Sequence, residues 1–273
     1  MLGGRCSEQS AYPPTPEYRV PSTDHPDLPA VSIAPMRPPN RSGSPRVAQR
    51  VPVSRQSVLP ARWKVVVAAG ALLIAIVWVL WPSPYAKVRN LDSSGASIIA
   101  FGDSLTAGYG AAPGEDYPSR LSALIAQPVV NAGVSGDTTE GALARLDADV
   151  LARNPRIVLI GLGGNDFLRG MAISSTGSNL RTIVRRIQGA GAMVVILGFR
   201  FPSLSANYEK MYKGVARDER CLFVPNVLAG ILTDPKLKSD EIHPNARGYV
   251  LMAERIAGPC RKLIRKADAA QRH

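Results

Sequence analysis

Short apolar runs alternate with segments of helical periodicity through most of the chain beyond about residue 96. The apolar runs consist mainly of Val, Ile and Leu, without the polar alternation typical of a sheet that has one face in water. This pattern predicts a mostly parallel sheet that is buried between helices on both faces. The predicted strands cover residues 98–101, 129–131, 157–162, 193–197 and 222–224, and the predicted helices lie near 117–126, 138–153, 176–190, 207–218 and 245–260.

The first 60 residues show no apolar periodicity and are rich in Pro, Ser and Arg. Proline pairs such as Pro13-Pro14 and Pro38-Pro39 interrupt any regular element. A segment of this composition buries too little apolar surface to offset the conformational entropy that is lost on folding. Residues 1–60 are therefore predicted to be a disordered tail.

One uncharged apolar run, from Val65 to Trp81, precedes the predicted domain. As a helix that rises about 1.5 Å per residue it reaches roughly 25 Å, the short end of what crosses a bilayer. Trp63 at one end, with Trp78 and Trp81 at the other, suits the two membrane interfaces. Residues 61–82 are predicted to be a transmembrane signal anchor, followed by a linker over 83–95 and a domain over 96–268. A buried core helix and a cleavable signal peptide are the alternatives.

Basic residues are distributed unequally around this run. Five lie within twenty positions on its N-terminal side, against two on the other flank. By the positive-inside rule, this asymmetry predicts a single-pass protein of the inner (cytoplasmic) membrane, with the tail in the cytoplasm and the domain in the periplasm or otherwise outside the cytoplasm. The basic residues are Arg46, Arg50, Arg55, Arg62 and Lys64 on one side, and Lys87 and Arg89 on the other.

The formal net charge of +12 is spread along the chain. Residues up to Lys64 contain nine Lys or Arg against four Asp or Glu, and the rest contains 24 against 17. No run of basic residues interleaved with aromatic ones is present, which argues against a nucleic-acid partner. The basic tail instead suits the anionic lipid headgroups of a cytoplasmic membrane surface.

Of the three cysteines, Cys6 lies in the tail, while Cys221 and Cys260 lie in the predicted domain. Cys221 opens a predicted strand and Cys260 ends the last predicted helix. If that helix runs antiparallel to the strand, both cysteines lie at the same end of the sheet. Outside the cytoplasm this pair could form a disulfide, and two buried free thiols are the open alternative.

Residues with catalytic potential follow the predicted strands. Ser104 comes directly after the first strand in Gly-Asp-Ser-Leu, which alone is also compatible with a turn or a helix cap. A serine hydroxyl becomes a good nucleophile beside a base that a third group orients, and Asp240 and His243 supply the orienting carboxylate and the base. Because reactive groups collect at the carboxyl ends of parallel strands, we expect these residues to meet there. Ser135 is a weaker rival as the nucleophile.

Two other turns offer hydrogen-bond donors for a developing oxyanion. Gly136 precedes a predicted helix whose N-terminus favours negative charge, although Asp137 and Glu140 there also fit an ordinary capping box. Asn165 lies in a Gly-rich turn after the third strand, where asparagine often serves the backbone conformation. Its side-chain amide could instead donate to an oxyanion.

A metal site at Asp240-x-x-His243 is not expected. Apart from His243, the chain has only His25 in the tail and His273 at its end. A zinc site takes three or four His, Cys or carboxylate ligands, and these are scarce around the motif.

The four segments together resemble the SGNH, or GDSL, hydrolase family, in particular its bacterial thioesterase, lysophospholipase and arylesterase branch. The resemblance covers about residues 96–262 and implies a flavodoxin-like three-layer α/β/α sandwich. It does not extend to the tail or to the apolar run. The matching segments are Gly-Asp-Ser-Leu at 102–105, Ser-Gly-Asp-Thr at 135–138, Gly-Gly-Asn-Asp at 163–166 and Asp-x-x-His-Pro at 240–244.

This resemblance implies Ser104 as the nucleophile, His243 as the general base and then acid, and Asp240 as the orienting carboxylate. The backbone amides of Ser104 and Gly136 and the side chain of Asn165 would form the oxyanion hole. The implied reaction is acyl transfer to the serine followed by hydrolysis of the acyl-enzyme, with no metal or organic cofactor.

Three further features concern the site: a departure inside one matching segment, the loop after another, and two aromatic residues. Glu241 occupies a position where this branch commonly carries glycine, so we expect an effect on the local turn or pH response without loss of a catalytic group. Residues 167–171 resemble the mobile acyl-binding loop of the thioesterases, with an ordinary loop as the alternative. Phe201 and Tyr208 are candidates either for an acyl groove or for core packing.

The expected substrate is a small-molecule, lipid or glycan ester. Lysophospholipid, an aryl or acyl ester and an acetylated envelope polysaccharide fit a domain outside the cytoplasm, whereas a coenzyme A thioester fits a cytoplasmic one. An acyl or acetyl transferase and a non-catalytic glycan-binding module on the same fold remain as alternatives. The sequence predicts no oligomeric state.

Overall fold

The computed structural model describes residues 61–80, 83–200 and 206–272. All of them belong to one unit of the chain, Pro60–His273. The predicted disordered tail and Phe201 lie outside the described residues, so the predictions made for them stay predictions.

Five parallel strands form the sheet of this unit, in the order β2-β1-β3-β4-β5. This is the order of flavodoxin-like sheets, which confirms the predicted parallel α/β fold. Chain connections leave β1 and β3 in opposite directions, so the carboxyl ends of these two strands border the crevice where such sheets bind ligands. The strands are β1 (Ser97–Gly102), β2 (Val129–Gly133), β3 (Pro155–Gly161), β4 (Met193–Leu197) and β5 (Leu222–Val224).

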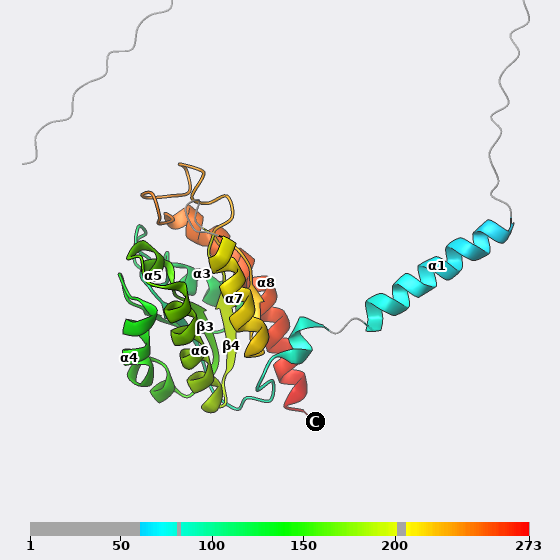
Figure 1. Ribbon diagram of the computed structural model, residues 1–273, viewed down its shortest axis with the longest axis horizontal. Coiled ribbons are helices and arrows are strands. Elements are labelled where there is room, and N and C mark those ends of the chain that lie inside the picture. The colour runs from blue at the N-terminus through cyan, green and yellow to red at the C-terminus, as the bar shows by residue number, and fades with distance from the viewer. Residues whose placement is uncertain (1–60, 81–82, 201–205, 273) are drawn as a thin grey trace, which may run out of the picture. The chain divides into compact units, whose positions relative to one another are not determined.

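Helices cover both faces of the sheet (Figure 1). Helix α3 packs against α8 on one face, and α4, α6 and α7 form neighbouring pairs on the other. The middle strands are buried on both sides, since Ile157 to Ile160 and all of β4 are almost fully covered. The helices are α2 (Ser104–Ala107), α3 (Tyr117–Ile125), α4 (Thr139–Asp149), α5 (Gly164–Leu168), α6 (Ile173–Gly189), α7 (Ala206–Asp218) and α8 (Ala246–Ala270), with 3-10 helices η1 (Pro84–Lys87) and η2 (Leu151–Arg153).

Helix α8 is longer than the sequence pattern predicts. The predicted end near residue 260 is wrong, because α8 continues past Pro259 to Ala270. Leu263, Ile264 and Ala267 are buried and extend the apolar face of the helix. Burial of this extra face outweighs the hydrogen bond that a proline removes from a helix interior.

Residues 83–95, predicted as a linker, contact the domain closely. Val88 is buried in the core, and Arg89 donates its backbone N–H to the carbonyl of Arg220. The side-chain amide of Asn90 donates to the carbonyls of Gln188 and Ala192 at 2.8 and 3.0 Å. This segment is therefore held against the domain by hydrogen bonds and packing.

The apolar run before it is helical, as α1 (Ala61–Leu80). Side chains 74–80 and residue Trp81 lie outside the described part of the chain. Within the described part, no helix is long and apolar enough to cross a membrane. The transmembrane anchor over 61–82 thus stays a prediction.

Cys221 and Cys260 are free thiols, which is the second of the two alternatives left open by the sequence. Cys260 is buried and Cys221 is partly so. Burial raises the pKa of each thiol to about 12, and the nearby Glu219 carboxylate adds to the rise at Cys221. Since the thiolate is the reactive form, both thiols are poorly reactive at neutral pH.

Candidate active site

The structure places Ser104 at the carboxyl edge of the sheet, two residues after the end of β1. Asp103 caps the short helix α2, because its carboxylate accepts a hydrogen bond from the backbone N–H of Leu105 at 3.1 Å. Gly108, with φ of +90°, ends this helix after one turn. The strand, the cap and the glycine together fix Ser104 at the mouth of the crevice.

His243 and Asp240 meet Ser104 as the sequence predicts. The Ser104 Oγ lies 2.9 Å from Nε2 of His243, and Nδ1 of the same ring lies 2.7 Å from Oδ2 of Asp240. A carboxylate accepts only, so Nδ1 carries the ring proton and Nε2 is left to accept from the serine hydroxyl. This arrangement gives the hydroxyl a correctly oriented base.

The loop that holds Asp240 keeps its carboxylate ionised. Its Oδ1 accepts the backbone N–H groups of Ile242 and His243, each at 2.9 Å. Partial burial by itself would raise the pKa of Asp240, but these amides and the imidazole of His243 lower it below its ordinary value. Glu241, at the position where the related branch commonly carries glycine, points into solvent and pairs with Lys238. It therefore does not disturb the hydrogen bonds that join Ser104, His243 and Asp240.

The predicted oxyanion donors lie on two turns beside this chain. Asn165, in α5, donates a hydrogen bond from Nδ2 to the carbonyl of Asp137 at 2.9 Å, which brings it next to Gly136. Gly136 has φ of +78°, a conformation that favours glycine. Among the described residues, the backbone amides of Ser104 and Gly136 have no hydrogen-bond acceptor. Both amides are thus available to a bound oxyanion.

The space in front of Ser104 is small. A cavity of about 20 Å³ touches Ser104, Asn165 and His243 and is bounded by the apolar side chains of Leu105, Leu168 and Ile242. This volume holds about one water molecule.

Exposed apolar side chains lie near the catalytic residues and the oxyanion donors. The ring of Tyr109 leans on that of His243, with centroids 4.5 Å apart, and the buried Tyr249 hydroxyl donates to the Tyr109 carbonyl at 2.8 Å. Leu168 and Val134 are also exposed, beside Asn165 and Gly136 respectively. Together with Leu105 and Ile242, which line the cavity, these side chains form an apolar rim beside the catalytic residues.

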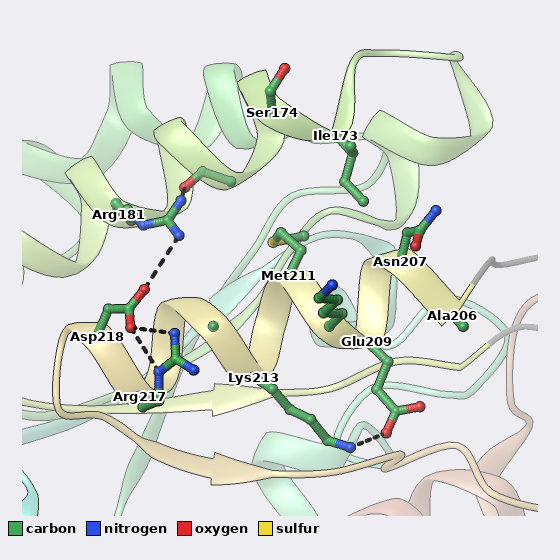
Figure 2. Close-up of a pocket in the computed structure, with 13 residues that line it drawn as sticks. Ile173, Ser174, Arg181, Ala206, Asn207, Glu209, Met211, Lys213, Arg217 and Asp218 are labelled. Atoms are coloured by element: carbon green, nitrogen blue, oxygen red, sulfur yellow. Dashed lines mark hydrogen bonds and ion pairs between the residues drawn. The ribbon is translucent and has the colours of Figure 1, made fainter.

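A much larger cavity, of about 960 Å³, lies elsewhere. Figure 2 shows the side chains that line it, on α6 and α7. Charged pairs line it, including Arg181 with Asp218 and Lys213 with Glu209 (Figure 2). It contains none of the residues that the sequence nominates for catalysis, so its size does not make it the active site.

The acyl-groove candidates take different positions. Tyr208 is buried in the core and meets Phe167 edge to face, with ring centroids 5.5 Å apart. Core packing is therefore the role that the structure gives Tyr208. Phe167 is partly buried, whereas the next residue, Leu168, reaches the cavity at Ser104.

Arg145 is a site residue that the sequence analysis missed. From α4, its guanidinium donates to the carbonyls of Gly102 and Ala132, at 2.9 and 3.0 Å, and so joins the carboxyl ends of β1 and β2. It also donates to the carboxylates of Asp137 and Asp149, each at 2.8 Å. The guanidinium carbon lies 4.4 Å from the centroid of the Phe101 ring. Arg145 thereby holds the turn of Gly136 against the strand that leads to Ser104.

Two buried carboxyl groups lie under the site. Asp166 accepts hydrogen bonds from the backbone and hydroxyl of Thr139 and from the hydroxyl of Thr176, which ties α5 to the start of α4 and to α6. Asp103 is 2% exposed. Burial, followed by the nearby carboxylates of Asp137 and Asp166, raises the pKa of Asp103 to about 7.

The described residues contain no cluster of three or more His, Cys, Asp or Glu that could hold a metal ion.

Comparison with known proteins points to one family. The model of the GDSL-like lipase/acylhydrolase family matches residues 100–251. The chain is 33% identical to esterase TesA of Pseudomonas aeruginosa, over 60% of this chain and 88% of that protein. It is 32% identical to thioesterase 1/protease 1/lysophospholipase L1 of Escherichia coli, over 67% of this chain and 94% of that protein. A crystal structure of TesA superposes with a TM-score of 0.58 and 31% identity, over 62% of this chain and 99% of that one.

The buried Asp103 predicts a pH-dependent stability. In the folded protein the Asp103 carboxyl group keeps its proton up to about pH 7, whereas in the unfolded chain it releases the proton near pH 3.8. The stabilising contribution is thus complete below about pH 4 and is lost as the pH rises through 7, a loss on the order of 4 kcal/mol. Asp103→Asn keeps the acceptor for Leu105 and removes the titration. Its melting temperature relative to the unsubstituted protein should therefore rise between pH 5 and pH 8, and a pH-independent difference would contradict the shift.

Arg145→Lys should slow catalysis because a lysine ammonium cannot make all the hydrogen bonds that the planar guanidinium makes to two carbonyls and two carboxylates. We expect kcat on a p-nitrophenyl ester to fall about tenfold to a hundredfold with little change in KM, as a misplaced oxyanion turn weakens transition-state binding. The affinity for a boronic acid that forms a tetrahedral adduct should fall in parallel. Arg186→Lys, at an exposed pair with Asp147, is the matched control. A lower melting temperature with unchanged kcat would show that Arg145 serves the fold alone.

Proposed function

The chain belongs to the GDSL-like lipase/acylhydrolase family and is an ester hydrolase, and we propose that it is a membrane-anchored serine esterase that hydrolyses carboxylic esters outside the cytoplasm. The observation that carries the catalytic part of this proposal is the continuous hydrogen-bond chain from Ser104 through His243 to Asp240. This is the arrangement that nucleophilic catalysis by serine requires.

In the proposed reaction, Ser104 Oγ attacks the ester carbonyl while His243 Nε2 takes the hydroxyl proton. The tetrahedral intermediate collapses as His243 returns this proton to the leaving alcohol, which leaves an acyl-enzyme. Water then attacks the acyl-enzyme while His243 takes its proton. The bond between the acyl carbon and Ser104 Oγ breaks as His243 gives the proton to Oγ, and the acid product departs. Asp240 stabilises the imidazolium that forms in each half of the reaction.

The oxyanion hole is assigned to the backbone amides of Ser104 and Gly136 and to the side chain of Asn165. An asparagine amide has two N–H donors. One of them already binds the carbonyl of Asp137, which orients the group and leaves the second for the oxyanion. Donors fixed in this way before the reaction lower the barrier without reorganising.

The proposed substrates are lysophospholipid, aryl or acyl esters and acetyl esters. The relatives support this range, because one is named a lysophospholipase and thioesterase and another, from Vibrio mimicus, an arylesterase. The exposed rim of Tyr109, Val134 and Leu168 suits an apolar part of such a substrate. A coenzyme A thioester is the corresponding substrate if the domain is cytoplasmic.

The proposed anchor is the uncharged run from Val65 to Trp81. Its support is the apolar sequence, the tryptophans at both ends and the excess of basic residues on the N-terminal side. The anchor would place the tail in the cytoplasm and Ser104 outside it.

Ser104→Ala should abolish ester hydrolysis. Loss of the nucleophile leaves only binding and the oxyanion donors, so we expect kcat on p-nitrophenyl acetate and butyrate to fall by about 10⁴-fold or more. Ser135→Ala, which removes the rival hydroxyl on the neighbouring turn, should stay within a few-fold of the unsubstituted enzyme. Full activity in Ser104→Ala would refute the assigned mechanism.

The topology is tested separately. Alkaline phosphatase, which is active only outside the cytoplasm, fused after His273 should be active in cells that express the full chain. The same fusion to a chain that lacks residues 61–82 should be inactive, because no segment would then export it. Activity of a cytoplasmic reporter fused at His273 would contradict the proposed orientation and favour a thioester substrate.

A further inference from the structure

The end of the domain opposite Ser104 carries a group of basic side chains around η1. This short helix packs against the C-terminal part of α8 (Figure 1). Two open cavities, of about 810 and 420 Å³, share the side chain of Tyr85. Basic residues from three parts of the chain line them: Lys87, Lys213, Arg217 and Arg220 in the first, and Lys262, Arg265 and Lys266 in the second.

Most of these cations have no partner within the described structure. Lys213 and Arg217 pair with the carboxylates of Glu209 and Asp218. The remaining five make no ion pair with any described carboxylate, and we call them the basic end: Lys87, Arg220, Lys262, Arg265 and Lys266.

Like charges that gather without a counter-charge repel one another, at a cost to the folded state. Several arginines elsewhere in the domain have a carboxylate partner, as Arg156 has Asp268 and Arg185 has Glu219. The excess at the basic end is therefore suited to an anion from outside the chain.

The length of helix α8 gives the distance from the basic end to the active site. His243 lies three residues before the first residue of α8, Ala246, and Lys262 and Lys266 lie sixteen and twenty residues into the helix. At about 1.5 Å per residue, the basic end is roughly 24 to 30 Å from the catalytic edge. The two features occupy opposite ends of the domain.

The chain path brings the basic end close to the predicted anchor. Helix α1 ends at Leu80, and Ser83, which lines the second cavity, follows three residues later. Three residues span at most about 11 Å even when fully extended. If α1 lies in a bilayer, the basic end must therefore lie at the bilayer surface.

We propose that the basic end binds the headgroups of anionic phospholipids and holds the domain with Ser104 directed away from the bilayer. Tyr85, between the two cavities, is of the residue type that favours the membrane interface. The inference rests on the proposed anchor and narrows the proposed substrate. An ester dissolved in the aqueous phase or carried on a polymer reaches Ser104, whereas a phospholipid that remains in the bilayer does not.

The binding test uses the piece that begins at Ser83. The TesA structure is matched over 99% of its length by 62% of this chain, so the hydrolase fold is complete without α1 and the tail. Sedimentation with vesicles of phosphatidylcholine alone, or of phosphatidylcholine with phosphatidylglycerol, measures binding. We expect binding only to the anionic vesicles, weakened by salt.

The informative variant is Lys262→Gln, Arg265→Gln and Lys266→Gln combined. These three exposed residues lie on α8 away from the catalytic edge. Each basic residue near an anionic surface raises the affinity about fivefold, so the loss of three should weaken binding to anionic vesicles on the order of a hundredfold. The matched control combines Lys210→Gln, Lys236→Gln and Arg247→Gln, which removes the same charge from exposed positions elsewhere and should change binding by less than about fivefold.

Equal losses in the two triple variants, or equal binding to both kinds of vesicle, would overturn the proposal. So would tighter binding of short duplex DNA than of anionic vesicles by the same piece.

Hydrolysis of a soluble p-nitrophenyl ester by the same samples tests the proposed function independently, since inactivity there leaves the vesicle result standing. On anionic vesicles this rate should persist, because Ser104 faces the solution. A large fall in the rate on binding would place the site against the bilayer and refute the orientation.

Discussion

The guanidinium of Arg145 is the contact on which the geometry of the active site depends most. It binds the carbonyls that end β1 and β2, the carboxylate of Asp137 and that of Asp149, and it stacks on Phe101. The strand that carries Ser104 and the turn that carries Gly136 are thereby fixed to one rigid group. Because the carbonyl of Asp137 in turn receives the amide of Asn165, all three oxyanion donors are positioned with reference to this arginine. A partly buried network with this many hydrogen bonds rigidifies the segments that it connects.

The same region concentrates negative charge under the site. Asp103, Asp137 and Asp166 lie close enough that the last two raise the pKa of the first, in addition to the larger effect of burial. Asp137 is balanced by Arg145 and Asp166 by hydroxyl and amide donors, whereas Asp103 has the amide of Leu105. As the helix cap, the buried Asp103 therefore lowers the free energy of unfolding more as the pH rises. The same cap fixes the start of the short helix α2, at which Ser104 lies.

The domain has two ends of different character. At the carboxyl edge of the sheet, reactive groups are paired with one another and an apolar rim lies beside them. At the other end, cations from η1, the turn before β5 and α8 gather without carboxylate partners among the described residues. The parallel sheet explains the separation, because all of its strands point the same way and every strand-to-helix turn that carries chemistry falls on one edge. The opposite edge is left free for contacts of another kind.

Apolar periodicity predicted the five strands and their parallel arrangement, since only strands covered on both faces are apolar throughout. The spacing of Ser104, Asp240 and His243 predicted that they would meet, because turns after parallel strands share one edge. The sequence alone thus determined the fold class and the chemical types at the site. Only the tertiary structure decided the position of Arg145, whose acceptors Gly102 and Ala132 are 43 and 13 residues away in the chain. It also decided that α8 continues past Pro259, that Glu241 points into solvent and that the two thiols are free. Each of these outcomes depends on which surfaces pack together. The local sequence pattern does not determine which residues far apart in the chain come into contact.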